Sequence, residues 1–304
     1  MPPFRAEAGG NRLHRFVTRR LVGLFLPLVM VMVIPPACTT SLVPDPPDTI
    51  TFGVIDVGQG LSQILKQGDR ALLFDAGTDE PALSWRTAWR KLGSPRIEAV
   101  VLSHRDLDHT GGLRFLDSTV NWSGRLVAGM WEDTAFIRSC CSNWNGPISI
   151  STIAQDDTLY FTDDCSIDCR WPPDVKPAEV PVTDDEVNEY SLVFTINYRN
   201  TGVLLTGDID STAASAITAT YTTALRADIV VIPHHGSASS NCPLFYGYVK
   251  PSTAIISVGE GNTYGHPAPS TLTLLANQGI VFLTTITQGT IIRRTEGYYW
   301  ENPR

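Results

Sequence analysis

Residues 103–112 read Ser103-His104-Arg105-Asp106-Leu107-Asp108-His109-Thr110-Gly111-Gly112, and they are the part of the sequence that indicates the fold most clearly. It follows an apolar strand predicted over residues 98–102, and it holds two of the six histidines of the 304-residue chain. Alternate residues of an extended segment project to one side, so His104, Asp106 and Asp108 face one way and His109 the other. Imidazole and carboxylate groups at this spacing predict the start of two adjacent metal sites, with a solvated charged loop as the alternative.

Two further clusters follow apolar strands, predicted over residues 202–206 and 228–232. The first is Gly207-Asp208, where a carboxylate at a strand end is placed to bridge two ions, and the second is His234-His235. Neighbouring side chains point apart, so we expect one histidine of the pair to ligate while the other orients a substrate or packs in the core. Acids and histidines at strand ends also serve simply as turn residues, but here all three clusters are expected to converge on one edge.

Strands and helices alternate from residue 50 onward, which predicts an α/β protein with two sheets packed face to face and helices outside. Strands are expected over 50–57, 62–66, 71–74, 98–102, 191–198, 202–206, 228–232 and 254–258, and helices over 83–92, 211–225 and 271–277. Residues 117–187, with four Trp, four Cys and several Pro, are expected to be the least regular part, a Trp- and Cys-rich insert.

The first 37 residues have the pattern of an export signal. Arg12, Arg15, Arg19 and Arg20 precede a 14-residue apolar run over 21–34, which is shorter than the roughly 20 residues that span a bilayer. A retained membrane anchor is the alternative. Ala37-Cys38 resembles a bacterial lipoprotein cleavage site, although Pro35-Pro36 departs from it, so lipidation stays open. Residues 38–49 form a Pro-rich tether, and we expect a periplasmic or cell-surface protein whose only membrane contact is through such a lipid anchor.

The chain is acidic. Removal of residues 1–37 takes five Arg and one Glu from 23 basic and 31 acidic side chains, which leaves a formal charge of −12. Since nonspecific nucleic-acid affinity comes from cationic groups that displace counterions, this charge argues against a nuclease that grips duplexes. Outside the cytoplasm the four cysteines between 140 and 169 are expected to form disulfides that staple one loop, with a structural zinc as the alternative.

Seven segments between residue 50 and about residue 290 resemble the metallo-β-lactamase superfamily, and within it the hydrolase domain of the ComEC competence-protein family. In the family's order they are Asp56-Val57-Gly58-Gln59-Gly60, Asp75-Ala76-Gly77, residues 103–112, Asn188-x-x-Ser191, Leu204-Leu205-Thr206-Gly207-Asp208, His234-His235-Gly236-Ser237 and Tyr264-Gly265-His266-Pro267. The resemblance implies a metallo-β-lactamase αββα sandwich over residues 50–304. The family's membrane-channel segments have no counterpart here, so we expect the hydrolase module to be exported by itself. Leu61 stands where the family usually has Asp, which puts the role of that acid in doubt.

The resemblance also implies a ligand set for two divalent ions, zinc or manganese. One ion is held by His104, Asp106 and the bridging Asp208, and the other by Asp108, His109, Asp208 and His234. Supporting roles are expected for Asp75, which braces the ligand loop, for Asn188, which stands nearest the place of a histidine of the superfamily, and for His235. Because Asp106 replaces a commoner histidine, the first site is rich in oxygen and shifts from zinc toward manganese or magnesium.

These ligands predict a hydrolase that uses a water activated by two metal ions. Asp108 is expected to ligate and to orient the nucleophile, and His266 and Ser237 to contact a phosphate or to protonate the leaving oxygen; a packed turn histidine is the alternative for His266. The leading hypothesis is a phosphodiesterase or nuclease. The alternatives are a hydrolase of a small ester, lactone or β-lactam and a binding protein on a retained scaffold, which the complete ligand set disfavours.

Overall fold

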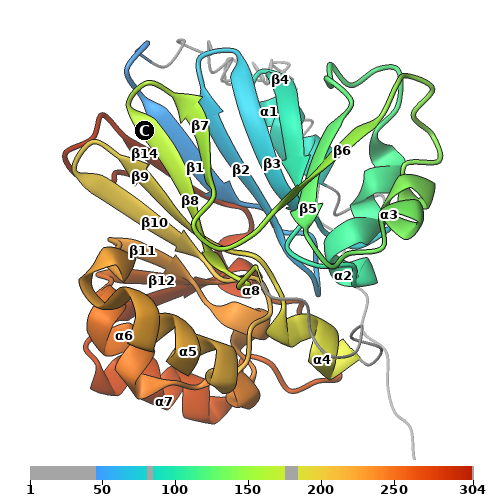
Figure 1. Ribbon diagram of the computed structural model, residues 1–304. Helices are drawn as coiled ribbons and strands as arrows, with labels where there is room; N and C mark the ends of the chain where they lie inside the picture. Colours follow the sequence, from blue (N-terminus) through green and yellow to red (C-terminus); the bar gives the residue numbers. More distant parts are fainter. Residues whose placement is uncertain (1–45, 81–84, 175–183, 303–304) are drawn as a thin grey trace, which may run out of the picture. The chain divides into compact units, whose positions relative to one another are not determined.

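Two sheets are formed by the residues that the computed structural model describes, which are 46–80, 85–174 and 184–302 (Figure 1). Within those ranges each sheet contains seven strands. The predicted export signal, Cys38 and the tether as far as residue 45 lie outside the described residues. Among the described residues, no helix is long and apolar enough to cross a membrane.

The first sheet joins an antiparallel half to a parallel half. In spatial order its strands are β14 (Ile291–Thr295), β1 (Ile50–Val54), β2 (Ser62–Gln67), β3 (Arg70–Ala76), β4 (Arg96–Val101), β5 (Arg125–Gly129) and β6 (Ser149–Ile153). Neighbours from β14 to β3 are antiparallel and those from β3 to β6 are parallel. β1 is buried along its whole length, as in a strand whose two faces are both covered.

The second sheet repeats this plan. Its strands in spatial order are β13 (Val281–Thr284), β12 (Thr253–Ile256), β11 (Ile229–Val231), β10 (Thr201–Leu205), β9 (Val193–Tyr198), β8 (Cys165–Trp171) and β7 (Thr158–Thr162). The neighbours from β13 to β10 are parallel and those from β10 to β7 are antiparallel. Each sheet is therefore mixed, and its parallel half carries the loops that bear the predicted ligands.

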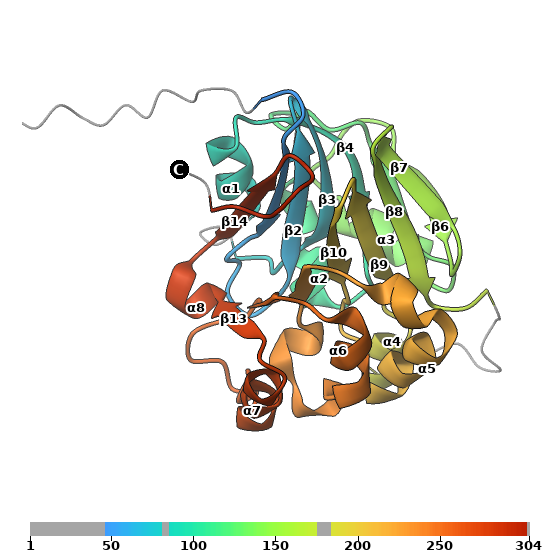
Figure 2. The same ribbon diagram turned by 90° about the vertical axis from the view of Figure 1, so that its left-hand side faces the viewer.

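Helices cover the outer faces of both sheets. The first sheet is flanked by α1 (Trp85–Lys91), α2 (Leu107–Thr110), the 3-10 turn η2 (Gly111–Phe115) and α3 (Thr134–Cys140). The second is flanked by α5 (Ser211–Tyr221), α6 (Pro243–Val249) and α7 (Pro269–Asn277), which lie together in Figures 1 and 2. The short helices α4 (Asp184–Glu189) and α8 (Thr285–Gln288) lie in connections. The layers run helix, sheet, sheet, helix, so the αββα prediction is confirmed.

Three apolar clusters hold these layers together. The central cluster joins the inner faces of the sheets, and in it the rings of Phe74 and Phe194 meet edge to face with centroids 6.0 Å apart. A second cluster packs Trp85 and its neighbours against the outer face of the first sheet, and a third packs helices α5 to α7 against the second sheet. Each fully buried aliphatic or Phe side chain contributes roughly 1.5–3 kcal/mol, so both faces of each sheet stabilise the fold.

Residues 117–187 differ from the expectation of an irregular insert. They contain β5 and β6 of the first sheet, β7 and β8 of the second, and helix α3. β8 is an ordinary strand whose residues from Cys165 to Cys169 alternate between buried and partly exposed. The strand was not predicted from the sequence, because its cysteine, arginine and tryptophan residues suggest a loop and hide the alternation of buried and exposed positions.

The predicted disulfide staple is absent, since the five cysteines that the structure describes are all free. Cys165 and Cys169 face the central cluster from β8, whereas Cys140 and Cys141 pack with the outer cluster of the first sheet. Cys242 belongs to the third cluster. The first sheet separates Cys140 and Cys141 from Cys165 and Cys169, and the second sheet separates the latter two from Cys242. Burial raises the pKa of the Cys141, Cys165 and Cys169 thiols to about 12, as expected for inert core thiols.

Candidate metal centre

The predicted ligands follow the carboxyl ends of parallel strands in both sheets. Residues 103–112 follow β4, Asp208 follows β10, and His234-His235 follow β11. Carboxyl ends of parallel strands lie at one edge of a sheet, and in this fold the two edges adjoin, as the contacts below show. The prediction that the three clusters converge is therefore matched by the geometry.

Close backbone contacts hold the loop that carries Asp108. The turn at Gly60 approaches it so closely that a Cβ atom on Gly60 would lie 2.5 Å from the Asp108 carbonyl oxygen. The next residue, Leu61, donates its backbone N–H to the same oxygen at 3.0 Å, and its side chain is buried in the central cluster. The family that this chain resembles usually carries an acid at this position, whereas in this chain position 61 is part of the apolar core.

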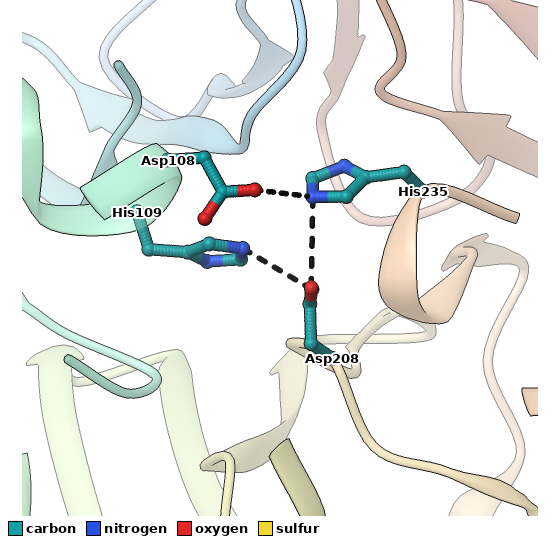
Figure 3. A group of neighbouring side chains, drawn as sticks. All are labelled: Asp108, His109, Asp208 and His235. Atoms are coloured by element: carbon teal, nitrogen blue, oxygen red, sulfur yellow. Dashed lines mark hydrogen bonds and ion pairs between the residues drawn. The ribbon is translucent and has the colours of Figure 1, made fainter. Parts of the chain in front are cut away.

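Asp108, His109, Asp208 and His235 form a compact set that we call the His–Asp group (Figure 3). One potential ligand atom from each residue lies within 4.8 Å of all the others. His109 Nε2 is 3.2 Å from Asp208 Oδ1, and His235 Nε2 is 3.2 Å from Asp108 Oδ2 and 3.5 Å from Asp208 Oδ2. His109, Asp208 and His235 are buried and Asp108 is half-buried.

Hydrogen bonds on the far side of each imidazole turn its Nε2 atom into the group. His109 Nδ1–H donates to Asp75 Oδ2 at 2.9 Å, and His235 Nδ1–H donates to the carbonyl oxygen of Ser257 at 2.9 Å. Asp75 is itself fixed, because it accepts hydrogen bonds from the backbone N–H of Ser103 at 2.7 Å and from the Ser103 hydroxyl at 2.8 Å. Partners of this kind set the tautomer and the orientation of histidines that bind metals.

Several buried polar atoms at this place have no hydrogen-bond partner among the described residues. They are His104 Nε2, His109 Nε2 and Asp208 Oδ1. Although His109 Nε2 and Asp208 Oδ1 are close, their geometry is not that of a hydrogen bond. A buried polar atom without a partner costs about 1–3 kcal/mol, so each needs an explanation. Imidazole nitrogens and a carboxylate oxygen that face one another across a few ångströms fit a divalent cation.

Charge pairing dominates the electrostatics of the group. Burial by itself lowers the pKa of His109 and His235 and raises that of Asp108 and Asp208, since it disfavours the charged forms. The opposite charges outweigh burial: both histidine pKa values are raised, that of His109 strongly, while the Asp208 pKa falls well below its ordinary value and the Asp108 pKa falls to about 2. A cation that binds here must displace the histidine protons.

His234 and His235 occupy an unusual turn. Both residues have positive φ angles, 50° and 55°, which bulky side chains seldom adopt. The turn sends His235 into the His–Asp group and leaves His234 Nε2 4.0 Å from Asp208 Oδ2, with the His234 ring 5.5 Å from that of His266. Left-handed backbone at non-glycine residues costs about 1–3 kcal/mol and is concentrated at functional sites. The geometry therefore offers His235, which we had expected in a supporting role, as the more direct ligand.

The remaining predicted ligands, His104 and Asp106, lie beside the group but outside its four-atom set. His104 Nδ1 bonds to the Ser103 hydroxyl at 2.9 Å, and His104 Nε2 is 3.5 Å from Asp106 Oδ2. The His104 and His109 rings are adjacent, with centroids 4.1 Å apart. The predicted site of His104 and Asp106 therefore adjoins the His–Asp group. That an ion binds at His104 and Asp106 stays a prediction.

Glu132 is a residue of this region that the sequence did not reveal. It follows β5, is half-buried, and has a buried carboxylate oxygen without a hydrogen-bond partner among the described residues. Burial raises the pKa of Glu132 to about 7, against the opposing charges of His104 and Arg105. Because β5 is parallel to β4, its carboxyl end faces the same edge; a prediction of β5 would have pointed to this acid.

A cleft of about 1020 Å³ opens over the His–Asp group. Its lining includes three more of the predicted residues: Asn188, Ser237 and His266. Asn188 is buried with its side-chain oxygen unpartnered, and the Ser237 hydroxyl bonds to that of Ser239 at 2.9 Å. Burial and the neighbouring His234 and His235 lower the pKa of His266, which favours its uncharged form.

Comparisons with known proteins agree with this geometry. A sequence profile of the metallo-β-lactamase superfamily matches residues 55–129, which include Asp75 and the stretch 103–112. In this stretch and in its two-sheet fold, the chain resembles the metallo-β-lactamase superfamily. Among solved structures, the metallo-β-lactamase fold protein YhfI from Bacillus subtilis matches 81% of this chain and 100% of its own, with a TM-score of 0.51 at 14% identity, which supports the fold alone.

Within the superfamily, the chain resembles the ComEC-like competence proteins. It is 29% identical over 250 residues to competence protein ComA of Neisseria gonorrhoeae and 26% identical over 261 residues to ComE operon protein 3 of Bacillus subtilis. These alignments cover 81% and 78% of this chain but only 32% of each relative. The chain thus spans about a third of the length of these relatives. It presents a metallo-β-lactamase hydrolase fold with a candidate metal site.

Proposed function

We propose that this chain of metallo-β-lactamase fold is an exported phosphodiesterase of the nuclease type that depends on two divalent metal ions. The observation that carries the proposal is the convergence of His109 Nε2 and Asp208 Oδ1, which have no hydrogen-bond partner among the described residues, with His235 Nε2 beneath an open cleft. One relative is named as a competence protein, and this favours a substrate related to nucleic acid.

The side chains present suit two ions that share one carboxylate. Asp108, His109, Asp208 and His235 would hold one ion, and His104 and Asp106 with Asp208 would hold the other. Bound ions supply positive charge for the oxygens of a phosphodiester and lower the pKa of a nearby water. In the hydrolysis a water oxygen bonds to phosphorus, the ester P–O bond breaks, and a proton from the water ends on the leaving oxygen.

The chain's own residues prepare this site. Asp75 and the Ser257 carbonyl keep the protons of His109 and His235 on Nδ1, so their Nε2 lone pairs face the group. His266 lines the wall of the cleft, where it would hydrogen-bond a substrate oxygen. The fixed backbone around Gly60 and Leu61 keeps Asp108 in place before any substrate arrives.

Export is proposed from residues 1–37, where a run of arginines precedes a short apolar core. Fractionation of cells that express the full chain checks it. Recovery from the periplasm or the cell surface, with residues 1–37 removed, is the expected result. An uncleaved chain in the cytoplasm would contradict the proposal, and labelling with a fatty acid at Cys38 would decide between a lipid anchor and simple cleavage.

The activity is tested with bis-p-nitrophenyl phosphate, single-stranded DNA and nitrocefin, each offered with manganese and with zinc. We expect hydrolysis of the two diesters by the wild-type chain and none by Asp208→Ala, which loses the proposed shared ligand and, with it, more than one equivalent of metal. Hydrolysis of nitrocefin alone would favour the alternative of a small-substrate hydrolase. Failure on all three substrates with both metals would overturn the proposal.

A further inference from the structure

Tyr264 forms an exposed aromatic surface on the wall of the cleft. Its side chain is 71% exposed, yet its ring stacks on that of His266 with centroids 5.8 Å apart and planes 24° apart. The tyrosine ring therefore lies offset beside that of His266, with most of its surface exposed. Leu107, 67% exposed, and Phe136 also line the cleft. Aromatic and apolar side chains in the lining, beside the polar His–Asp group, suit a substrate with both characters.

The loop that carries Tyr264 is held in place by Asn262. Its side-chain amide donates to the carbonyl oxygens of Gly259 at 2.9 Å and of His266 at 2.7 Å, and its side-chain oxygen accepts the His266 backbone N–H at 3.0 Å. From Tyr264 the ring contacts continue through His266 to His234, which adjoins Asp208. The aromatic surface is thus fixed at a defined place relative to the His–Asp group, and little ordering is needed when a substrate binds.

The charge of the cleft disfavours recognition of a long phosphate backbone. Among the described residues that line it, Arg105 is the only lysine or arginine, whereas four aspartates are present: Asp106, Asp108, Asp133 and Asp208. Proteins that track a nucleic-acid backbone do so with many cationic side chains. Ions at the floor can neutralise one phosphate, but the walls offer no row of positive charge. Affinity beyond that phosphate must come from uncharged contacts, and stacking of a base on an aromatic ring is one that this cleft offers.

We propose that Tyr264 is the residue that determines specificity in this diesterase, because its accessible face stacks a nucleobase attached next to the scissile phosphate. The inference rests on the proposed function and extends it to a substrate class, diesters with an unpaired nucleobase. Paired and stacked bases in a duplex do not present a free face, so unpaired nucleic acid is preferred. Tyr264 acts by binding the base and takes no part in the bond-breaking step.

Two esters with the same leaving group test the proposal. Thymidine 5′-(p-nitrophenyl phosphate) carries a base, and methyl p-nitrophenyl phosphate carries none. Stacking on one aromatic residue contributes about 1–3 kcal/mol, so Tyr264→Ala should lower kcat/KM for the thymidine ester roughly 5- to 150-fold. The methyl ester should change less than about twofold, and Tyr264→Phe should restore most of the loss. Tyr298→Ala, at a tyrosine 73% exposed that does not line the cleft, is the matched control.

A second readout does not depend on turnover. Calorimetry compares the binding of thymidine 5′-phosphate and methyl phosphate to the manganese-loaded wild type and Tyr264→Ala, and only the thymidine compound should lose affinity. Equal losses on both ligands, or no loss on either, would overturn the role of Tyr264. If neither ester is hydrolysed with manganese or zinc, the proposed function fails instead, and the binding comparison still decides whether Tyr264 holds a base.

Discussion

Asp75 lies outside the His–Asp group, and Asp75→Asn measures how much its carboxylate contributes to metal binding. Asp75 is 1% exposed, and its two oxygens accept three hydrogen bonds, one from the Ser103 backbone and one each from the Ser103 hydroxyl and His109 Nδ1. Asparagine has almost the same shape and tolerates the positive φ of 53° at this position. The substitution therefore changes charge and hydrogen bonding while it leaves the backbone in place.

The amide cannot serve both sides. If its oxygen faces the Ser103 backbone, the NH₂ group faces His109 Nδ1 and drives the imidazole proton to Nε2, where it blocks the lone pair that would bind a cation. If the amide is turned the other way, the NH₂ group opposes the Ser103 N–H. A hydrogen bond to a charged group contributes about 1.5–3 kcal/mol, and the loss of such a partner lowers metal affinity about 10- to 100-fold.

Competition against a chromophoric chelator measures the dissociation constant for manganese and zinc, and circular dichroism checks the fold. We expect Asp75→Asn to raise the dissociation constant by that factor. Asp228→Asn is the matched control: Asp228 accepts the Gly202 backbone N–H at 2.9 Å just before β11 begins, at the end of the strand remote from the group. An Asp75→Asn chain that is folded and binds metal within twofold of the wild type would refute the reasoning.

Three further predictions follow from the same geometry. His235→Ala should weaken metal binding more than His234→Ala, and the reverse order in a metal titration would restore His234 as the ligand. In the metal-free chain, the pKa values of His109 and His235 are raised, so the protonated histidines stabilise the folded state. This stabilisation is complete below the unfolded-state pKa of about 6.5, and it is lost as pH rises through the folded-state pKa values. The Tm in chelator should therefore fall as pH rises above about 6.5, whereas with saturating metal it should rise, because binding displaces protons; a flat or rising Tm in chelator would contradict the charge pairing. Manganese should restore diesterase activity better than zinc after chelation, and Asp106→His should reverse that order; an unchanged order would show that residue 106 does not set the metal.

The sandwich and the place of the site were predictable because their signals are local. Apolar strands that end in Asp or His identify the parallel halves of both sheets, and the stretch 103–112 concentrates four potential ligands behind one strand. The strand predicted over 62–66 ends one residue before β2 does, and the strand predicted over 202–206 is displaced by one residue from β10. Such boundaries follow from alternation and from glycine turns, which the sequence displays directly.

What escaped prediction depends on contacts between distant segments. The choice between His234 and His235 is set by a left-handed turn and by the Ser257 carbonyl, which β12 brings alongside. Glu132 was missed because β5 lies in a segment whose cysteines and tryptophans resemble a loop. The same composition suggested a disulfide staple, but the distribution of those cysteines over separate apolar clusters is a property of the folded layers.

Anomalous X-ray diffraction from crystals grown with manganese shows directly whether the His–Asp group binds a metal ion. We expect a strong anomalous peak bounded by Asp108, His109, Asp208 and His235, a second peak beside His104 and Asp106, and loss of both in Asp208→Ala. No peak at the His–Asp group at saturating manganese, with the four side chains placed as in Figure 3, would show that these residues are not a metal site.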